Sequence, residues 1–389
     1  MRLGFDVIAG ANSQTLAYSA ANRLNSASGA YGSKTWIFDG VGNRTSETNA
    51  AVTDSYTYPA TNNKLQSIVR NAATVRSFTY DNAGNMATDV RSGITYAYTY
   101  NNANRLKTVT SQGNLLGTYT YNGFEQLIGR VITNSGTANG TVFSVHDVFG
   151  NVIAELNAAG ATVREYIWLP EAEIAPTMGS RTTVDRPMAV VSGVNTTPTL
   201  LMVHVDHLHR PVKMTNAAGA SVWSAVWLPW GGAHTITGAE TLDARFPGQW
   251  FQLEAGLHYN WHRSYDPSLG RYTQPDPLGF VDGPGVYAYG LNTPLRSVDK
   301  TGLMLLPPYN PGFTYPPDSP TCFEDCSFSE TLDCAGEATT ACILIGAVVT
   351  AQTTPLGGGI CFAACETLVI KACKARARRR CSQHCFGAP

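Results

Sequence analysis

Two short segments near residue 300 each begin with an aspartate and carry a glycine three residues later. They read Asp276-Pro277-Leu278-Gly279-Phe280 and Asp299-Lys300-Thr301-Gly302-Leu303. Two carboxyl groups that share a site can activate a water molecule or a backbone amide, because like charges a few ångström apart raise the pKa of one of them. Asp276 and Asp299 are therefore candidate catalytic residues, with Arg271 as a cation that could hold one carboxylate ionised. A structural role is the alternative, since aspartate and glycine are typical of ordinary turns.

An ordered string of motifs precedes these turns. It comprises FPGQWF at 246–251, GLHYN at 256–260 and RSYDPSLGRY at 263–272. The string resembles the core that closes the β-shell of Rhs (YD-repeat) proteins. The resemblance implies an autoproteolytic core, a scissile bond between Leu303 and Met304, and a variable C-terminal cargo that is often a toxin. Lys300 stands where the family has proline, and pairing with Lys300 would lower the pKa of Asp299 and impair it as an acid.

A repeated unit fills the first part of the chain. An aromatic residue, or histidine in the last unit, precedes a turn rich in Asp, Asn and Gly at spacings of 20, 20, 22, 20, 21 and 25 residues. Each unit has the length of one β-hairpin, whose aromatic packs on the inner face while Asp or Asn and Gly form the turn. We expect a mainly β fold, a spiral of stacked antiparallel β-hairpins, which again resembles a YD-repeat shell. The units begin at Tyr18, Phe38, Tyr58, Tyr80, Tyr100, Tyr121 and His146.

The sequence after Leu303 has a different composition. Prolines crowd residues 304–321 and predict a stiff linker, and all nine cysteines of the chain follow it. Two units with the same cysteine spacing contain helix-forming residues, so we expect a small disulfide-rich α-helical hairpin formed in an oxidising compartment. Zinc binding by these cysteines is the alternative. The disulfide candidates are Cys322, Cys326, Cys334, Cys342, Cys361, Cys365, Cys373, Cys381 and Cys385.

The chain as a whole is weakly charged. Charged residues make up 14% of its 389 residues and the formal net charge is −1, which argues against nucleic-acid binding by the whole chain. The basic run from Lys371 to Arg380 is either a solvated helix end or a contact for anionic lipid or nucleic acid. His204, His207 and His209 lie close together, but no nearby cysteine or paired acid completes a metal site, so a structural role is favoured. We expect no metal and no cofactor.

These observations predict four segments: YD repeats (1–200), a repeat-associated core (201–303), a Pro-rich linker (304–321) and a Cys-rich variable domain (322–389). Neither a signal peptide nor a membrane span is recognisable, so we expect secretion or cell-surface display through a dedicated export system. The chain could be the end of a larger shell, a displaced cassette or a truncated gene.

Two functions are consistent with the sequence. The first is a polymorphic-toxin shell fragment whose core cleaves itself and releases the tail. Its partners would be the rest of a longer shell, a delivery machine and an immunity protein. The second is a non-catalytic surface protein whose repeats bind carbohydrate or a neighbouring cell, with an uncleaved tail.

Overall fold

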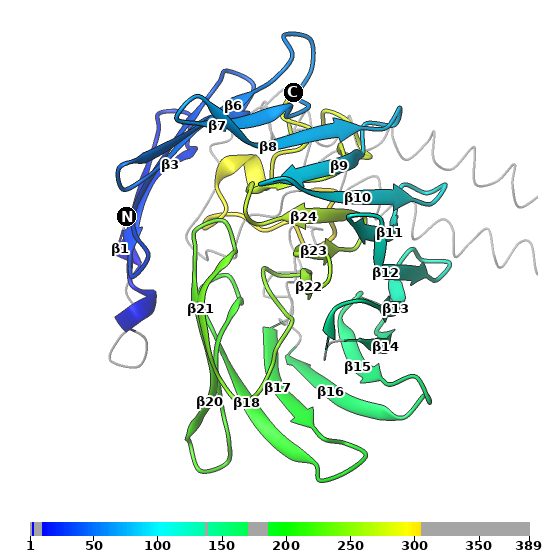
Figure 1. Cartoon of the computed structure of the whole chain (residues 1–389). Helices are drawn as coiled ribbons and strands as arrows, with labels where there is room; N and C mark the ends of the chain where they lie inside the picture. Colours follow the sequence, from blue (N-terminus) through cyan, green and yellow to red (C-terminus); the bar gives the residue numbers. More distant parts are fainter. Residues whose placement is uncertain (1, 4–9, 137–138, 170–185, 305–389) are drawn as a thin grey trace, which may run out of the picture. The chain divides into compact units, whose positions relative to one another are not determined.

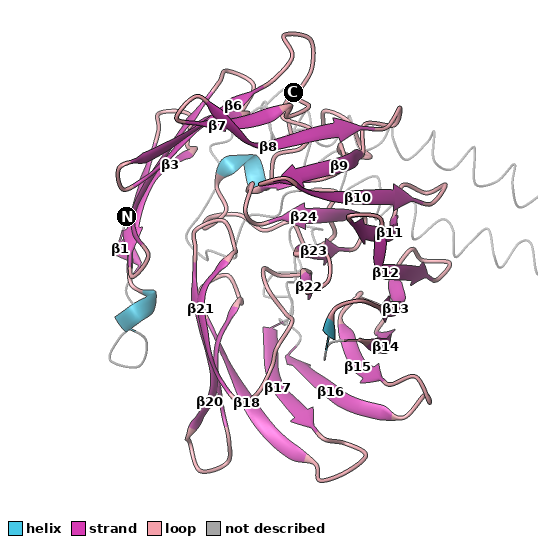
Figure 2. Cartoon of the chain, in the orientation of Figure 1, coloured by secondary structure: helices cyan, strands magenta, loops and turns pink. Residues whose placement is uncertain are grey.

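The computed structural model describes residues 2–3, 10–136, 139–169 and 186–304, which all belong to one compact unit. The nine cysteines, the basic run and the linker beyond Met304 lie outside the described residues. Regular structure in the described part is almost entirely β-strand, as the repeats predicted (Figure 2). Short 3-10 helices also occur there, among them Gly10–Asn12 and Gly290–Asn292.

Twenty-one of the described strands form one antiparallel sheet, and each pairs with the next strand along the sequence (Figure 1). This sheet is the array of hairpins that the repeats predicted. It extends to Gly238, so the predicted domain boundary at 200/201 falls inside β18. The strands are β1 (Arg2–Leu3), β2 (Gln14–Tyr18), β3 (Leu24–Gly29), β4 (Gly32–Phe38), β5 (Arg44–Asn49), β6 (Val52–Thr57), β7 (Ser67–Arg70), β8 (Ala73–Tyr80), β9 (Met86–Arg91), β10 (Ile94–Tyr100), β11 (Leu106–Ser111), β12 (Asn114–Tyr121), β13 (Leu127–Ile132), β14 (Gly140–His146), β15 (Val152–Leu156), β16 (Thr162–Leu169), β17 (Arg186–Ser192), β18 (Thr199–Val205), β19 (Pro211–Thr215), β20 (Ser221–Trp227) and β21 (Ala233–Gly238).

The repeat turns form because the aspartate side chain closes its own loop. In the turn between β8 and β9, Asp81 Oδ1 accepts the backbone N–H of Asn85 at 2.8 Å, and Oδ2 accepts the Asn85 side-chain amide at 2.9 Å. Gly84 has φ +88°, a backbone conformation that other residues rarely adopt. The amide of Asn85 also donates to Asn104 Oδ1 in the next repeat turn at 3.0 Å. One asparagine therefore closes its own turn and links it to its neighbour.

In some repeats the aromatic residue before the turn also links neighbouring repeats. Tyr100 Oη donates to the backbone oxygen of Met86 at 2.8 Å, and Tyr121 Oη donates to that of Leu106 at 2.8 Å. Both rings are half-buried and pack against the main apolar cluster, as expected for the inner face of the sheet. Tyr98, two residues before Tyr100, lies on the same face and is buried more deeply. Successive repeats are therefore held by packing and by side-chain hydrogen bonds as well as by the strand ladder.

A second, four-stranded antiparallel sheet forms the core. It consists of β22 (Trp250–Gln252), β23 (Leu257–Asn260), β24 (Arg263–Asp266) and β25 (Arg271–Tyr272), and it lies on the inner side of the curved large sheet (Figure 1). Repeat turns contact the core and the loops that follow it. The contacts include Asn292 Nδ2 to Gly42 O (3.0 Å), Tyr287 Oη to Gly84 O (2.7 Å), Gln274 Nε2 to Asn104 O (3.1 Å) and Trp261 Nε1 to Phe124 O (3.0 Å).

The first strands of the large sheet meet its last strands. Asn12 Nδ2 donates to the backbone oxygen of Ala225 in β20 at 3.0 Å, and the ring of Trp36 lies edge-on to Trp230 with centroids 5.9 Å apart. An apolar cluster at this junction includes Trp36, Trp230 and the core residues Tyr265 and Tyr289. The two ends of the sheet are therefore joined through side chains and through the core.

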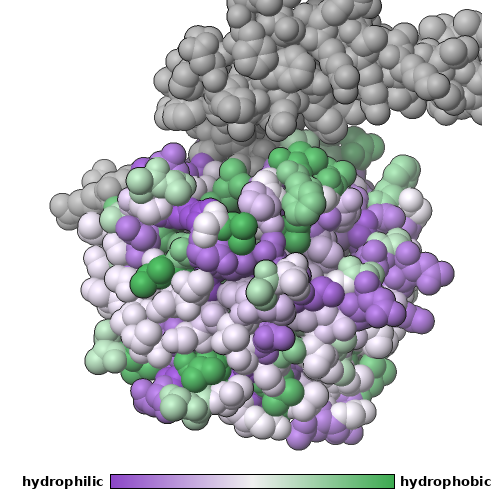
Figure 3. All heavy atoms as spheres, turned by 90° about the horizontal axis from the view of Figure 1, so that it is seen from above, coloured by the Kyte–Doolittle hydropathy of each residue, from purple (hydrophilic) through white to green (hydrophobic). Residues whose placement is uncertain are grey.

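The surface seen from above in Figure 3 mixes polar and apolar side chains. Among the large apolar residues exposed in the described part are Val148 and Phe280, both in turns or loops. None of the described helices has the length and apolar character that crossing a membrane requires.

Candidate functional site

Asp276 lies in the loop after β25, where the sequence places the first acidic turn. Its backbone N–H donates to the oxygen of Val286 at 2.8 Å, and its Oδ1 accepts the N–H of Leu278 at 2.8 Å. Gly279, with φ +75°, closes the turn by donating to the Asp276 carbonyl at 3.0 Å. The carboxyl group is buried, with 4% of the side chain exposed. Turn geometry therefore fixes this carboxyl group inside the core.

Asp299 is also buried and holds the segment that leads to the predicted cleavage point. Its Oδ1 accepts the N–H groups of Gly302 at 2.7 Å and Leu303 at 3.1 Å. Its Oδ2 accepts the hydroxyl of Tyr272 at 2.7 Å. Gly302 has φ +70°, a left-handed backbone conformation that favours glycine, which explains the glycine in this motif. Leu303 and Met304, which flank the predicted scissile bond, are half-buried.

Arg263 brings the two acids together. Its Nη2 lies 3.0 Å from Asp276 Oδ2 and 3.1 Å from Asp299 Oδ2. Its Nε donates to the carbonyl of Gly302 at 2.6 Å, and its guanidinium carbon lies 3.7 Å from the ring centroid of Tyr272. One buried cation therefore contacts both carboxylates and the backbone just before the predicted cleavage point.

Arg271 lies elsewhere, which corrects the expectation from the sequence. Its guanidinium donates to Tyr58 Oη at 3.0 Å and to the backbone oxygen of Asn63 at 2.6 Å, and it packs over Tyr287. Arg271 therefore joins β25 to the repeat sheet. Arg263 lies within the motif string, but only the folding of β24 against the loop at 299–303 distinguishes it from Arg271.

The pKa of Asp276 is raised above its usual value. Burial is the main cause, and the negative charge of Asp299 adds to it, whereas Arg263 and the N–H of Leu278 act in the opposite direction. Burial also raises the pKa of Tyr272 well above its usual range, and Asp299 reinforces this, so Tyr272 stays protonated and donates to Asp299. The site thus combines two buried carboxyl groups with one cation, an arrangement that favours the protonated form of one carboxyl.

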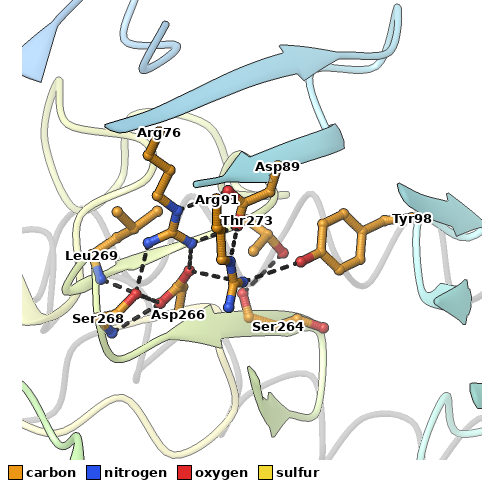
Figure 4. Close-up of polar contacts among 9 residues, drawn as sticks. All are labelled: Arg76, Asp89, Arg91, Tyr98, Ser264, Asp266, Ser268, Leu269 and Thr273. Carbon is orange, nitrogen blue, oxygen red and sulfur yellow. Dashed lines mark hydrogen bonds and ion pairs between the residues drawn. The ribbon is translucent and has the colours of Figure 1, made fainter. Parts of the chain in front are cut away.

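A second buried cluster has a different composition (Figure 4). Arg76 of β8 lies 2.5 Å from Asp89 of β9 and 2.6 Å from Asp266 of β24, while Arg91 lies 2.6 Å from Asp89 and 3.9 Å from Asp266. Ser268 donates its N–H and its hydroxyl to Asp266 Oδ1. We call these five residues the clasp, because they join the repeat sheet to the core.

The histidines considered from the sequence contact different partners. His204 Nε2 lies 3.0 Å from Thr215 Oγ1, and His207 Nε2 lies 2.9 Å from the backbone oxygen of Leu295. His207 and His209 belong to the turn between β18 and β19. Within residues 2–3, 10–136, 139–169 and 186–304, no three His, Cys, Asp or Glu side chains are grouped as a metal site requires.

The chain is similar to curated proteins and to solved structures. No family model matches this sequence. Toxin protein Tse5 of Pseudomonas aeruginosa is 39% identical over 102 residues, which are 26% of this chain and 8% of Tse5. A probable deoxyribonuclease, RhsA of Dickeya dadantii, is 34% identical over 99 residues, 25% of this chain and 7% of RhsA. The crystal structure of TcdB2-TccC3 without its hypervariable C-terminal region aligns with 76% of this chain and 17% of that chain, with a TM-score of 0.48 and 16% identity.

The molecule is a sheet of hairpin repeats with a β-core on its inner side that carries a buried acid pair. Together with the ordered motif string and the curated relatives, these features support membership of the Rhs/YD-repeat family. The chain spans less than a tenth of the length of Tse5 and of RhsA.

Proposed function

We propose that this chain is the closing part of a polymorphic-toxin shell, and that its core cleaves its own backbone between Leu303 and Met304. Cleavage would separate the Cys-rich tail, which would act as the effector. The observation that carries this proposal is the contact of one arginine, Arg263, with two buried aspartates beside the segment at 302–303. The toxin named among the relatives supports the same class of function.

The two carboxyl groups would divide the chemistry of peptide hydrolysis. Asp299 would act as the base and take a proton from a water molecule, which would replace one of the four donors that the carboxylate contacts in this structure. The resulting hydroxide oxygen would attack the Leu303 carbonyl carbon. Asp276, whose raised pKa favours the protonated form, would donate its proton to the amide nitrogen of Met304 as the carbon–nitrogen bond breaks. Arg263 would hold both acids in place and stabilise the negative charge that develops on the Leu303 carbonyl oxygen during the attack.

The proposal is tested by intact mass measurement of the full chain under denaturing conditions. We expect the wild-type protein to yield a separate fragment that begins at Met304, and Asp276→Asn and Asp299→Asn to remain whole. Asp81→Asn is the matched control, because Asp81 closes a repeat turn with similar hydrogen bonds and lies outside the acid pair. A single uncut wild-type species at neutral and at mildly acidic pH would contradict self-cleavage and favour a non-catalytic surface or carbohydrate-binding protein.

The remaining expectations follow from this function. The rest of a longer shell and a delivery machine would be partners of the sheet, and an immunity protein would be a partner of the released tail. Delivery outside the cell would suit a tail stapled by disulfides. Anionic lipid or nucleic acid would be the target of the basic run in that tail. Non-reducing and reducing mass measurements of the full chain test the disulfides, since each bridge lowers the mass by two hydrogens.

A further inference from the structure

The segment at 299–302 is held along its backbone as it approaches the proposed scissile bond. The carbonyl oxygens of Asp299, Thr301 and Gly302 accept hydrogen bonds, and that of Lys300 packs closely against Gly248. A Cβ atom on Gly248 would approach the Lys300 oxygen to 1.8 Å and the Lys300 carbonyl carbon to 2.7 Å. The three hydrogen bonds run from Asn260 Nδ2 to Asp299 O (2.8 Å), from His262 N to Thr301 O (3.0 Å) and from Arg263 Nε to Gly302 O (2.6 Å).

Gly248 belongs to a turn that its hydrogen bonds and the packing of its neighbours hold in place. Pro247 and Gly248 occupy its central positions, Gly248 has φ +79°, and Gln249 N–H donates to the Phe246 carbonyl at 2.7 Å. Phe246 is buried and stacks on Tyr289 with ring centroids 5.3 Å apart. Buried Gln249 contacts His258 Nδ1 through its side-chain oxygen at 2.7 Å. A side chain added at position 248 must therefore displace the Lys300 backbone.

Asn260 holds the preceding peptide, Asp299–Lys300, through its side chain. Its amide donates both to the Asp299 carbonyl at 2.8 Å and to Tyr272 Oη at 2.7 Å, and Tyr272 in turn donates to the Asp299 carboxylate. Two consecutive peptides are thus fixed by independent contacts, Asp299–Lys300 by a hydrogen bond from Asn260 and Lys300–Thr301 by the close approach of Gly248.

We propose that Gly248 and Asn260 are positioning residues that clamp two consecutive peptides, Lys300–Thr301 and Asp299–Lys300, and thereby set the place of the Asp299 carboxylate and of the Leu303–Met304 bond. This inference rests on the proposed self-cleavage. Neither residue supplies a proton or touches the reacting atoms. They act by holding the Asp299 carboxylate in place relative to the Leu303–Met304 bond. A displacement of about 1 Å in such a site can slow a reaction about 100-fold.

The test compares Gly248→Ala with Gly113→Ala in the full chain. Gly113 has nearly the same backbone conformation, φ +81°, but no heavy atom lies within 4 Å of a Cβ built there. We expect cleavage, followed by pulse–chase and denaturing mass measurement, to slow about 100-fold or more in Gly248→Ala and to be unchanged in Gly113→Ala. The pH profile should keep its midpoint, because the acids themselves are intact. An unchanged rate in folded Gly248→Ala would overturn the inference.

Two further measurements keep the clamp testable if cleavage fails or if the added methyl group prevents folding. In the uncleavable Asp276→Asn background, amide exchange of residues 299–304 should be faster with Gly248→Ala and unchanged with Gly113→Ala. Asn260→Ala adds no volume and should also speed that exchange and slow cleavage. Absence of cleavage in the wild type would defeat the proposed function alone, whereas unchanged exchange in these variants would defeat the clamp alone.

Discussion

The clasp and the acid pair are two buried clusters built from the same residue types. In the clasp, Arg76 and Arg91 face Asp89 and Asp266, so cations and acids are equal in number. In the candidate site, Arg263 is the cation that contacts both Asp276 and Asp299. Both pairs of carboxyl groups are almost fully buried, so burial does not distinguish the two clusters.

The balance of charge gives the two clusters opposite acid–base behaviour. Burial by itself raises the pKa of Asp266, but Arg76 and Arg91 outweigh it and lower that pKa to about 2. Burial also raises the pKa of Asp276, and there the opposing effect of Arg263 is too small to reverse it. A matched set of charges stabilises a joint between two sheets, whereas a surplus acid leaves a carboxyl group that can hold and deliver a proton.

Replacing the shared cation should have the largest effect. Arg263→Lys keeps a positive charge but loses the fork that reaches both carboxylates and the Gly302 carbonyl. We expect the rate of cleavage to fall by about 10³-fold or more. The same exchange in the clasp, Arg91→Lys, should leave the rate unchanged because Arg91 does not contact the acid pair. Equal losses of rate in the two variants would remove the distinction between the clusters.

Breaking the clasp should instead reduce stability. Asp266→Asn leaves Arg76 with an incomplete set of acidic partners in a buried place, and we expect the free energy of unfolding to fall by about 3–5 kcal/mol. The fraction of Asp266→Asn that is folded should still cleave at the wild-type rate. Denaturant unfolding of uncleavable Asp276→Asn and of the double variant measures the difference. A stable double variant would mean that the clasp does not join the core to the sheet.

The pH dependence of the two clusters should be opposite in sign. The depressed pKa of Asp266 means that its stabilising effect is complete above pH 3.8 and is lost as the pH falls toward about 2. The raised pKa of Asp276 means that its protonated form is lost as the pH rises through that pKa. Cleavage should therefore slow as the pH rises through the pKa of Asp276, while the clasp keeps its stabilising effect above pH 3.8. Rates and melting temperatures measured from pH 2 to 8 would separate the two, and a rate that keeps rising up to pH 8 would exclude Asp276 as the proton donor.

Local patterns predicted the repeat sheet because each hairpin is specified within about twenty residues. The Asp81 turn contains its own hydrogen-bond acceptor, its left-handed glycine and the asparagine that closes it. The sequence also predicted the two acidic turns that begin at Asp276 and Asp299, because the form of each turn depends on residues within a few positions and not on tertiary contacts. The predicted helical tail and its disulfides remain predictions, because they lie beyond residue 304.

The identity of the cation could not be read from the sequence. Arg263 and Arg271 lie eight positions apart in strands β24 and β25, and both belong to the motif string. Arg263 reaches the acid pair because β24 lies beside the loop at 299–303, while Arg271 faces the repeat sheet and contacts Tyr58. Contacts between segments so far apart along the chain depend on packing, which a local pattern does not encode.

The sequence by itself determined the strand-and-turn alternation, the inward aromatic residues and the two acidic turns, since these depend on neighbours within a few positions. Tertiary structure decided which arginine contacts Asp276 and Asp299, how Arg76 pairs with Asp266 in the clasp, and how closely Gly248 packs against the Lys300 carbonyl. The physical reason is that burial and charge balance act on groups brought together from distant segments. The pKa of a carboxyl group therefore depends on the folded environment and not on the turn that carries it.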